Sequence, residues 1–302
     1  MIDWIKNKIY KTGLYIPYDR FKTTKLRGEM KMDEKQSAVN YSWSNHKTSD
    51  TLYVLGSGLS VMDFKAKDWE EVSRHDSFGF NGWVFHDFIP TYYGIEPMAN
   101  EKVFAWYIKA LQEKSESYKN MPIFVQYQHL KMRDKHFEYT GIFQDNLFYN
   151  APYMPNTLNE NVLKRHIKTW MEKKHVDLSE VFHYAGSLSY VITMAYIMGY
   201  KKIVLLGVDL NSSEYFYSSK KAGDLAKGFN EFQINRPKEE KWNLKATHNT
   251  MSKKVSGSFG CLPISYFIQN FSDLAKKQGV ELLIGNRGSA LYPMLDLYSF
   301  PK

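Results

Sequence analysis

Cysteine is nearly absent from this chain, which has a single cysteine, Cys261, among 302 residues. One cysteine excludes an internal disulfide framework and any cluster of thiolate metal ligands. A chain that uses cysteine so sparingly fits a reducing compartment, so we expect a cytoplasmic protein. At this length the chain can bury a substantial core, and we expect one large domain with a small addition rather than two equal domains.

Long apolar runs are absent as well. No stretch approaches the ~18 uninterrupted apolar residues that a membrane-spanning helix needs, because Lys201 and Lys202 interrupt the longest candidate. The N-terminus has neither the apolar core nor the small-residue cleavage site of a secretory signal peptide. We therefore expect no spanning helix and no export by that route.

The motifs of several well-known enzyme classes are also missing. The chain contains no HExxH helix, no nucleophile elbow, no Walker A loop and no Cys/His cluster. Beyond the N-terminus its basic residues are interspersed with acidic ones and no recognition motif occurs, so a nucleic-acid partner is not expected. Aromatic residues are abundant instead, at 16% of the chain with 22 tyrosines, which can serve polar ligands.

Much of the net charge of +8 lies at one end of the chain. Residues 1–31 contain eight Lys or Arg against three acidic residues, interleaved with aromatic side chains. Two interpretations stay open: peripheral contact with the anionic inner face of a membrane, or a solvated helix packed on the domain. Residues 1–49 are interpreted as a basic N-terminal appendage, in which the polar residues 30–49 are expected to form a linker.

The remaining residues, 50–302, predict an α/β domain with a mainly parallel sheet. Short apolar runs at 51–55, 76–80, 90–95, 123–127, 203–206 and 280–284 are typical of buried strands. Segments with helical spacing occur at 63–74, 100–117, 159–173, 186–198 and 264–278, and a closing helix is expected at 289–298. This alternation indicates a Rossmann-like α/β/α sandwich.

The most strongly patterned part of that domain is residues 186–217, GSLSYVITMAYIMGYKKIVLLGVDLNSSEYFY. Its helix feeds a buried strand, and in an open parallel sheet ligands bind outside the carboxyl ends of the strands. We therefore expect the site just after this strand, with Gly207, Asp209 and Asn211 lining it. From 211 to 254 the periodicity disappears, which predicts a lid inserted over the ligand.

Two short polar stretches around this strand end are open to more than one interpretation. The turn Gly56, Ser57, Gly58 follows the first strand and could bring backbone N–H groups close to a phosphate or nucleobase, but a tight turn without a ligand explains it equally well. Asp209 and Asn211 make at most a degenerate metal pair. Because an Asp at such a place more often caps a turn or bonds a ligand hydroxyl, no metal is expected.

The predicted lid carries three further candidates. Tyr215 and Tyr217 could donate phenolic hydrogen bonds to a departing phosphate, or could pack as aromatic rings. His248, near the far end of the lid, has an imidazole with the right pKa to take a proton from an acceptor hydroxyl at neutral pH.

The order of these motifs resembles the bacterial sialyltransferases of glycosyltransferase family 42 and the related glycosyltransferase domain of flagellin-modifying proteins. The resemblance rests on GSGLSVMDF after the first strand, FNGW at the end of the second, SLSYVITMAYIMGYKKIVLLGVDL, the lid tyrosines and the late His248. It covers roughly residues 51–290. It implies a GT-A-like variant of the Rossmann-like fold with a lid, a CMP-sialic acid donor, inversion at the anomeric carbon, and neither metal nor cofactor.

The resemblance also implies roles for single residues. The Gly56 to Gly58 turn would border the donor, Asn81 would bond the donor nucleotide, and Ser187 would lie near the cytidine. Tyr217 would contact the phosphate, and His248 would be the general base that activates the acceptor hydroxyl.

Three positions depart from the family pattern. Glu96 stands where the family has Asn, Tyr184 where it has Arg, and Asn211 where the first phosphate-binding tyrosine would lie, a role that Tyr215 could take. Because the resemblance implies that these positions contact the donor, another CMP-nonulosonate, CMP-Kdo or a UDP- or GDP-hexose stays open, as does a nucleotide- or glycan-binding module without turnover. The expected acceptor is a hydroxyl of a surface glycan, as in lipopolysaccharide or capsule synthesis, and the oligomeric state, a homo-oligomer included, stays open.

Overall fold

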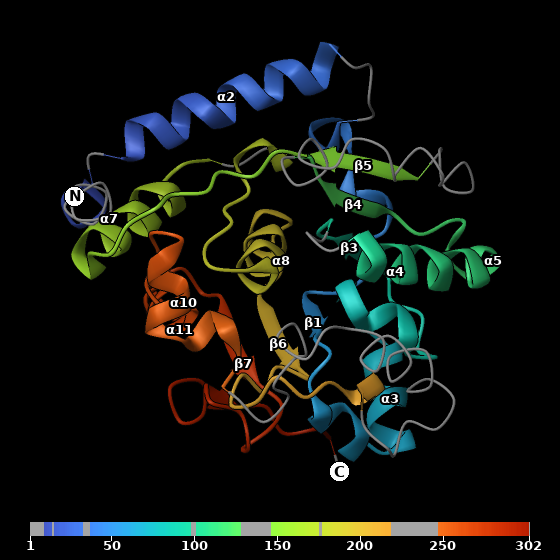
Figure 1. Ribbon diagram of the computed structural model, residues 1–302. Helices are drawn as coiled ribbons and strands as arrows, with labels where there is room; N and C mark the ends of the chain where they lie inside the picture. Colours follow the sequence, from blue (N-terminus) through green and yellow to red (C-terminus); the bar gives the residue numbers. More distant parts are fainter. Residues whose placement is uncertain are drawn as a thin grey trace.

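An eight-stranded, wholly parallel sheet forms the centre of the protein (Figure 1). The computed structural model describes residues 9–13, 15–32, 37–97, 101–127, 146–174, 177–218 and 247–301. The strands follow the order β5-β4-β3-β2-β1-β6-β7-β8, and each neighbouring pair is parallel. Their bounds are β1 (Thr51–Leu55), β2 (Asp76–Phe80), β3 (Tyr92–Ile95), β4 (Ile123–Gln126), β5 (Leu147–Asn150), β6 (Lys202–Leu206), β7 (Glu281–Ile284) and β8 (Asp296–Leu297).

Helices cover both faces of this sheet. Their bounds are α2 (Ile16–Met32), α3 (Ala66–Ser73), α4 (Glu101–Glu113), α5 (Ser115–Tyr118), α7 (Glu160–Met171), α8 (Ser187–Ile197), α10 (Lys253–Ser258) and α11 (Ile264–Lys276). Because successive strand residues point to opposite faces, Leu52 and Val54 pack in one core with α7, α8 and α11. Tyr53 and Leu55 pack in a second core with α3, α4 and α5.

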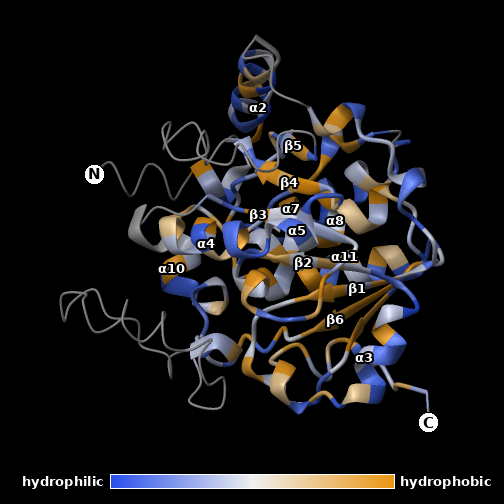
Figure 2. Ribbon diagram, turned by 90° about the vertical axis from the view of Figure 1, so that its right-hand side faces the viewer, coloured by the Kyte–Doolittle hydropathy of each residue, from blue (hydrophilic) through white to orange (hydrophobic). Residues whose placement is uncertain are grey.

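The result is the Rossmann-like α/β/α sandwich that the alternating pattern predicts. Figure 2 shows the apolar strands, β1 and β6 among them, between helices whose outer surfaces are polar. The chain direction across the sheet reverses between β1 and β6, which pair over residues Thr51 to Leu55 and Lys202 to Leu206. Such a switch point leaves a crevice beyond the carboxyl ends of the two strands.

Several parts of the fold differ from the sequence prediction. The predicted helix at 289–298 is wrong: the segment forms turns and the short strand β8, because Pro293 lacks an N–H and Ser289 Oγ donates to the Val208 carbonyl instead of facing solvent (2.6 Å). Strand β5 was not predicted. The helix predicted from residue 63 begins at Ala66, after a 3₁₀ turn at Leu59–Asp63.

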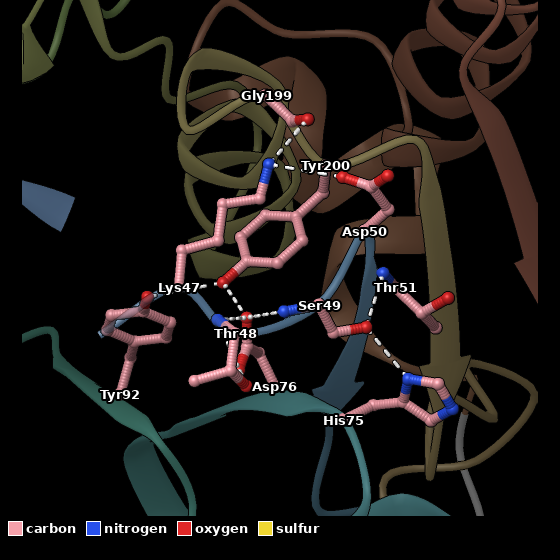
Figure 3. A network of polar contacts seen from close by, with 10 residues as sticks. All are labelled: Lys47, Thr48, Ser49, Asp50, Thr51, His75, Asp76, Tyr92, Gly199 and Tyr200. Carbon is pink, nitrogen blue, oxygen red and sulfur yellow. Dashed lines mark hydrogen bonds and ion pairs between the residues drawn. The ribbon is translucent and has the colours of Figure 1, made fainter. Parts of the chain in front are cut away.

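The predicted linker is also wrong for residues 37–49, which are folded against the sheet. Ala38 is fully buried, and the Thr48 amide and hydroxyl donate to the buried Asp76 carboxylate at the start of β2 (2.9 and 2.6 Å). Tyr200 donates to the same carboxylate (2.8 Å), and Lys47 reaches the Gly199 carbonyl (2.9 Å), as Figure 3 shows. A buried carboxylate needs such partners, so residues 47–49 connect the end of α8 to the start of β2. The division at residue 49 itself stays a prediction.

No helix within the described ranges is both long enough and apolar enough to cross a bilayer. That finding bears on the described residues alone, and the placement of the basic N-terminal residues 1–8 lies outside them.

Candidate functional site

A cavity of about 460 Å³ lies beyond the carboxyl ends of β1, β2, β3 and β6, at the switch point of the sheet. The predicted site residues that line it are Gly56, Ser57, Gly58, Asn81, Ser187, Gly207, Asp209, Tyr215, Tyr217 and His248. Of the predicted set Asn211 alone lies elsewhere, because its side-chain amide donates to the Gly288 carbonyl (2.7 Å) on the exposed side of the turn. The structure therefore brings together residues that are up to about 190 positions apart in the chain.

The turn after β1 is clamped to the end of β6 by a buried carboxylate. Asp209, which is 8% exposed, accepts hydrogen bonds from the Ser60 amide (2.9 Å) and the Ser60 hydroxyl (2.5 Å). Asn286 donates a third bond to the same side chain (3.3 Å). These partners belong to the chain itself, so Asp209 positions the turn.

The glycines of this turn are required by close packing. A Cβ on Gly58 would lie 2.5 Å from Asp209 Oδ2, and one on Gly207, whose φ is +64°, would lie 2.3 Å from the Gly56 carbonyl oxygen. The amides of Gly56 and Gly58 donate to the carbonyls of Leu206 (2.8 Å) and Gly207 (2.7 Å). Those two N–H groups are therefore engaged within the chain, and the tight-turn interpretation accounts for both glycines.

A ring of hydrogen bonds joins three further lining residues, Asn81, Ser187 and Glu96. Asn81 Nδ2 donates to Ser187 Oγ (3.0 Å), the Glu96 amide donates to Asn81 Oδ1 (3.0 Å), and Ser187 Oγ donates to the Glu96 carboxylate. Ser187 is the first residue of α8, as predicted, so the Glu96 carboxylate lies at the positive end of that helix. An acidic side chain of the protein thus occupies a position suited to an anion.

Two stacked tyrosines form the wall next to β2. The rings of Tyr215 and Tyr217 lie 5.2 Å apart and nearly parallel, at 10°, and the Tyr217 hydroxyl contacts the Tyr107 hydroxyl (3.1 Å). Burial raises the pKa of Tyr215 to about 12 and holds the pKa of Tyr217 well above its usual value. Both phenols therefore keep their protons at neutral pH and can donate hydrogen bonds.

His248 also lines the cavity. Its Nε2 is 3.4 Å from the Tyr215 hydroxyl, its Nδ1 is 2.8 Å from Thr250 Oγ1, and its amide donates to the Leu210 carbonyl (3.3 Å). Burial lowers the pKa of His248, because desolvation disfavours the imidazolium. The imidazole is therefore neutral at pH 7, the form that accepts a proton.

Unusual backbone conformations gather around the same cavity. Within the described part of the chain the non-glycine residues with positive φ are Asn81 (+47°), Ala185 (+58°) and Leu210 (+59°). All three line the cavity. Such conformations are costly and tend to occur at functional sites, which makes this cavity the candidate site on grounds independent of its side-chain chemistry.

The remaining wall was not apparent from the sequence. It includes Met154, Asn156, Phe259, Cys261 and Ile264, which come from the loop after β5, from the end of α10 and from the start of α11. No motif or periodicity marks these residues, since they meet only through the tertiary fold. Apart from Asn156, they are apolar residues and the single cysteine.

Tyr184, at a position where the resembled family has Arg, does not line the cavity. Its side chain is fully buried, its hydroxyl donates to the Thr157 carbonyl (2.9 Å), and the Leu262 amide donates to it (2.7 Å). Tyr184 therefore fixes the loop that carries Asn156.

Three or more His, Cys, Asp or Glu side chains do not gather in a potential metal site anywhere in the described ranges. The expectation that no metal takes part stays a prediction. Residues 219–246, which make up most of the predicted lid, lie outside the described residues.

Comparison with known proteins gives matches among solved structures. Neither a protein-family model nor a curated protein matches the chain. The monofunctional alpha-2,3-sialyltransferase Cst-I from Campylobacter jejuni is 16% identical, with a TM-score of 0.45 over 83% of this chain and 82% of that chain. The sialyltransferase CstII from Campylobacter jejuni in complex with CMP-3FNeuAc is 17% identical, with a TM-score of 0.40 over 82% of this chain and 85% of that chain. These similarities assign no role to any residue of the cavity.

Proposed function

We propose that this cavity binds a nucleotide-activated sugar and that the protein is a glycosyltransferase. The observation that carries the proposal is the meeting of one neutral imidazole, His248, and two protonated phenols, Tyr215 and Tyr217, in a cavity at the switch point of the sheet. A base for the acceptor and hydrogen-bond donors for a departing phosphate are the two needs of such a transfer.

His248 is the proposed general base. In the proposed tautomer Nδ1–H donates to Thr250 Oγ1 across the 2.8 Å contact, and Nε2, which lies 3.4 Å from the Tyr215 hydroxyl, carries the lone pair that takes the proton. The acceptor hydroxyl gives its proton to Nε2 as its oxygen attacks the anomeric carbon. Attack from the side opposite the leaving group inverts that carbon. Thr250 is thus a positioning residue for the base.

The leaving group is proposed to be a nucleoside monophosphate such as CMP. As the bond from the anomeric carbon to the phosphate oxygen breaks, the electron pair stays on the phosphate, which departs as a dianion. In this scheme Tyr215 and Tyr217 donate hydrogen bonds to it. The Tyr217 hydroxyl lies 3.1 Å from the Tyr107 hydroxyl, and the scheme takes Tyr107 as the donor of that pair so that the Tyr217 proton goes to the phosphate. This scheme needs no metal, because the phenols stabilise the charge that a divalent ion would otherwise neutralise.

The proposed donor is CMP-sialic acid or a related CMP-nonulosonate, in line with the motif order of the sequence, and the acceptor is a surface-glycan hydroxyl. CMP-Kdo and UDP- or GDP-hexoses are the alternatives. Ser57 and Asn81 both line the cavity and are the proposed contacts to the nucleotide. The glycan would be presented at the cytoplasmic face of the membrane, where lipid-linked glycans are assembled.

The proposal is tested by ligand binding followed by product analysis. Thermal unfolding is followed with CMP, UDP and GDP, since a nucleotide that binds the folded state raises the melting temperature. We expect CMP to give the largest rise, and labelled CMP-sialic acid to yield labelled product with an acceptor-glycan mixture. A larger rise with UDP or GDP would replace the donor. CMP binding without any labelled product from a panel of CMP-sugars would leave a binding module and refute the transferase.

The phenols are tested with Tyr215→Phe, which keeps the ring stacked on Tyr217 and removes the hydroxyl. We expect kcat to fall roughly 10- to 100-fold with little change in stability, because one donor to the leaving phosphate is lost. Unchanged kcat would remove Tyr215 from the scheme. Tyr196→Phe is the matched control, since that hydroxyl bonds Gln278 on the surface (2.5 Å), outside the cavity lining.

A further inference from the structure

Helix α2 has two faces of different character. The inner face carries Ile16, Asp19, Thr23 and Met30, which are buried at 7%, 2%, 6% and 2% exposure. These positions recur at the three- and four-residue spacing of one helix face. The helix therefore lies against the domain along one side, which Figure 1 shows at the edge of the molecule next to α7 and β5.

Specific polar bonds fix this inner face. The Asp19 carboxylate accepts hydrogen bonds from the Asn156 amide (2.8 Å) and the Asn156 side chain (2.9 Å). Further along, Arg27 Nε donates to the Ala151 carbonyl (3.1 Å), and its guanidinium lies 3.7 Å from the Glu180 carboxylate. The rotation of α2 about its axis is thereby set, so the residues on its outer face are defined.

The outer face combines exposed aromatic rings with exposed cations. Two large aromatic side chains are exposed to solvent, Phe21 at 66% and Tyr18 at 50%. Lys22 and Lys25 are exposed on the same face, since residues 18, 21, 22 and 25 follow the i, i+3, i+4, i+7 pattern. Lys22 Nζ lies 5.7 Å from the centre of the Tyr18 ring.

The charge of this face is of one sign. On the outer face the exposed charged side chains are Lys22 and Lys25. Arg20 lies against the Tyr153 ring, 5.8 Å from its centre, while Asp19 is buried in the inner face and Glu29 is half-buried. Exposed cations are attracted to the anionic headgroups of a bilayer, and amphipathic aromatic rings such as tyrosine are enriched at the headgroup level. Each such cation contributes about fivefold to binding of an anionic surface.

We propose that the outer face of α2, formed by Tyr18, Phe21, Lys22 and Lys25, binds the surface of a bilayer that contains anionic lipids. The occupant is a lipid surface because the face offers both cations for headgroup phosphates and a projecting ring for the apolar boundary. This proposal does not depend on the reaction in the cavity, so glycosyl transfer and bilayer binding stand or fall separately.

The placement of α2 has a consequence for the cavity. Asp19 on the inner face of α2 bonds Asn156, which lines the cavity. Phe259 also lines the cavity and is 71% exposed, and the next residue, Gly260, packs under the ring of Tyr10. Bilayer binding through α2 would therefore hold this part of the cavity lining close to the lipid surface. A lipid-linked acceptor is the kind of substrate that such an arrangement suits.

The test is sedimentation of the full chain with vesicles of phosphatidylcholine alone and with about 30% phosphatidylglycerol added. We expect binding to the anionic vesicles only. The double variant Lys22→Glu with Lys25→Glu should weaken that binding by about 30-fold or more, because two favourable contacts become repulsive. Phe21→Ala should weaken it roughly tenfold while leaving the net charge unchanged.

The matched control is Lys67→Glu with Lys277→Glu, two exposed lysines elsewhere that give the same change in net charge. It should bind vesicles within about twofold of the unaltered chain. Equal loss in both double variants would mean a diffuse charge effect, and no binding by the unaltered chain would also overturn the proposal. Thermal unfolding of each variant shows that it is folded, and transfer to a soluble acceptor should be unaffected.

Discussion

The clamp at Asp209 leads to a prediction that separates support of the turn from direct contact with a ligand. In Asp209→Asn the side chain keeps its shape, but one carboxylate oxygen becomes an NH₂ group. That NH₂ faces two donors, the Ser60 hydroxyl and Asn286 Nδ2, where the carboxylate accepted from both (2.5 and 3.3 Å). The Ser60 hydroxyl can rotate to accept, whereas the Asn286 amide is left against another donor.

The magnitude follows from these contacts. Each hydrogen bond to a charged, buried acceptor is worth about 1.5–3 kcal/mol, and the substitution weakens one of them and breaks another. We expect Asp209→Asn to lower the free energy of unfolding by about 2–4 kcal/mol, which corresponds to a fall in melting temperature of roughly 3–6 °C for a chain of this length. Ser60→Ala removes the hydroxyl partner alone and should cost about 1–2 kcal/mol.

The assay is thermal and urea unfolding of Asp209→Asn, Ser60→Ala and the double variant, each with and without CMP. Because the two residues act as one clamp, we expect the double variant to be more stable than additive losses predict, with a coupling of about 1 kcal/mol or more. CMP should bind all three, more weakly than the unaltered chain. Unchanged stability in Asp209→Asn together with complete loss of CMP binding would refute the clamp and make Asp209 a ligand contact.

Three further outcomes are expected. Burial raises the pKa of Asp19 from 3.8 to about 6, so the folded state binds this proton more tightly than the unfolded state. The free energy of unfolding should therefore fall as pH rises between about 4 and 6, by at most about 3 kcal/mol. Urea unfolding at pH 4.5 and 7 should show a smaller difference for Asp19→Asn than for the unaltered chain. Gly82→Ala puts a Cβ 2.3 Å from the Tyr217 ring, so we expect kcat to fall more than tenfold and the free energy of unfolding to fall by about 1–3 kcal/mol. Gly28→Ala is the control: its Cβ has open space around it, so kcat should be unchanged and the free energy of unfolding unchanged or slightly raised. Glu96→Gln removes a charge at the start of α8 and should raise kcat/KM for acidic-sugar donors relative to neutral-sugar donors; an unchanged ratio would show that Glu96 does not select the donor.

The parts of the fold that could be predicted are those whose pattern is local. The helix α8 and the strand β6 have a long apolar helix and a β-branched run in immediate succession, and the structure has both within a residue or two of the prediction. The ends of β1 and β6 were placed by the same reasoning, and with them the position of the cavity. Strand β5 has only four residues and no alternation, so its pairing with β4 carries no signal in the sequence.

The parts that could not be predicted depend on contacts between distant residues. Asp209 meets Ser60 across 149 positions, and Ser187 meets Glu96 across 91. Sequence patterns report which side chains face a core, but not which polar groups on different elements meet. Gly58 illustrates the same limit, because glycine is needed there to leave room for the side chain of Asp209, which is distant in the sequence.

The reaction scheme is tested most directly by the rate of sugar transfer from a CMP-activated donor in the unaltered chain and in His248→Asn. Asn is a preferred cap of a helical turn, and its Oδ1 can accept a bond from the Thr250 amide, which lies 3.4 Å from Nδ1 in the unaltered chain, so the fold and CMP binding should persist. His248→Asn lacks Nε2 and therefore lacks the proposed base, so we expect its kcat to be about 10²–10⁴-fold lower. Because burial lowers the pKa of His248, the activity of the unaltered chain should decline only below pH 6.5. A folded, CMP-binding His248→Asn protein with the rate of the unaltered chain would contradict the proposed mechanism.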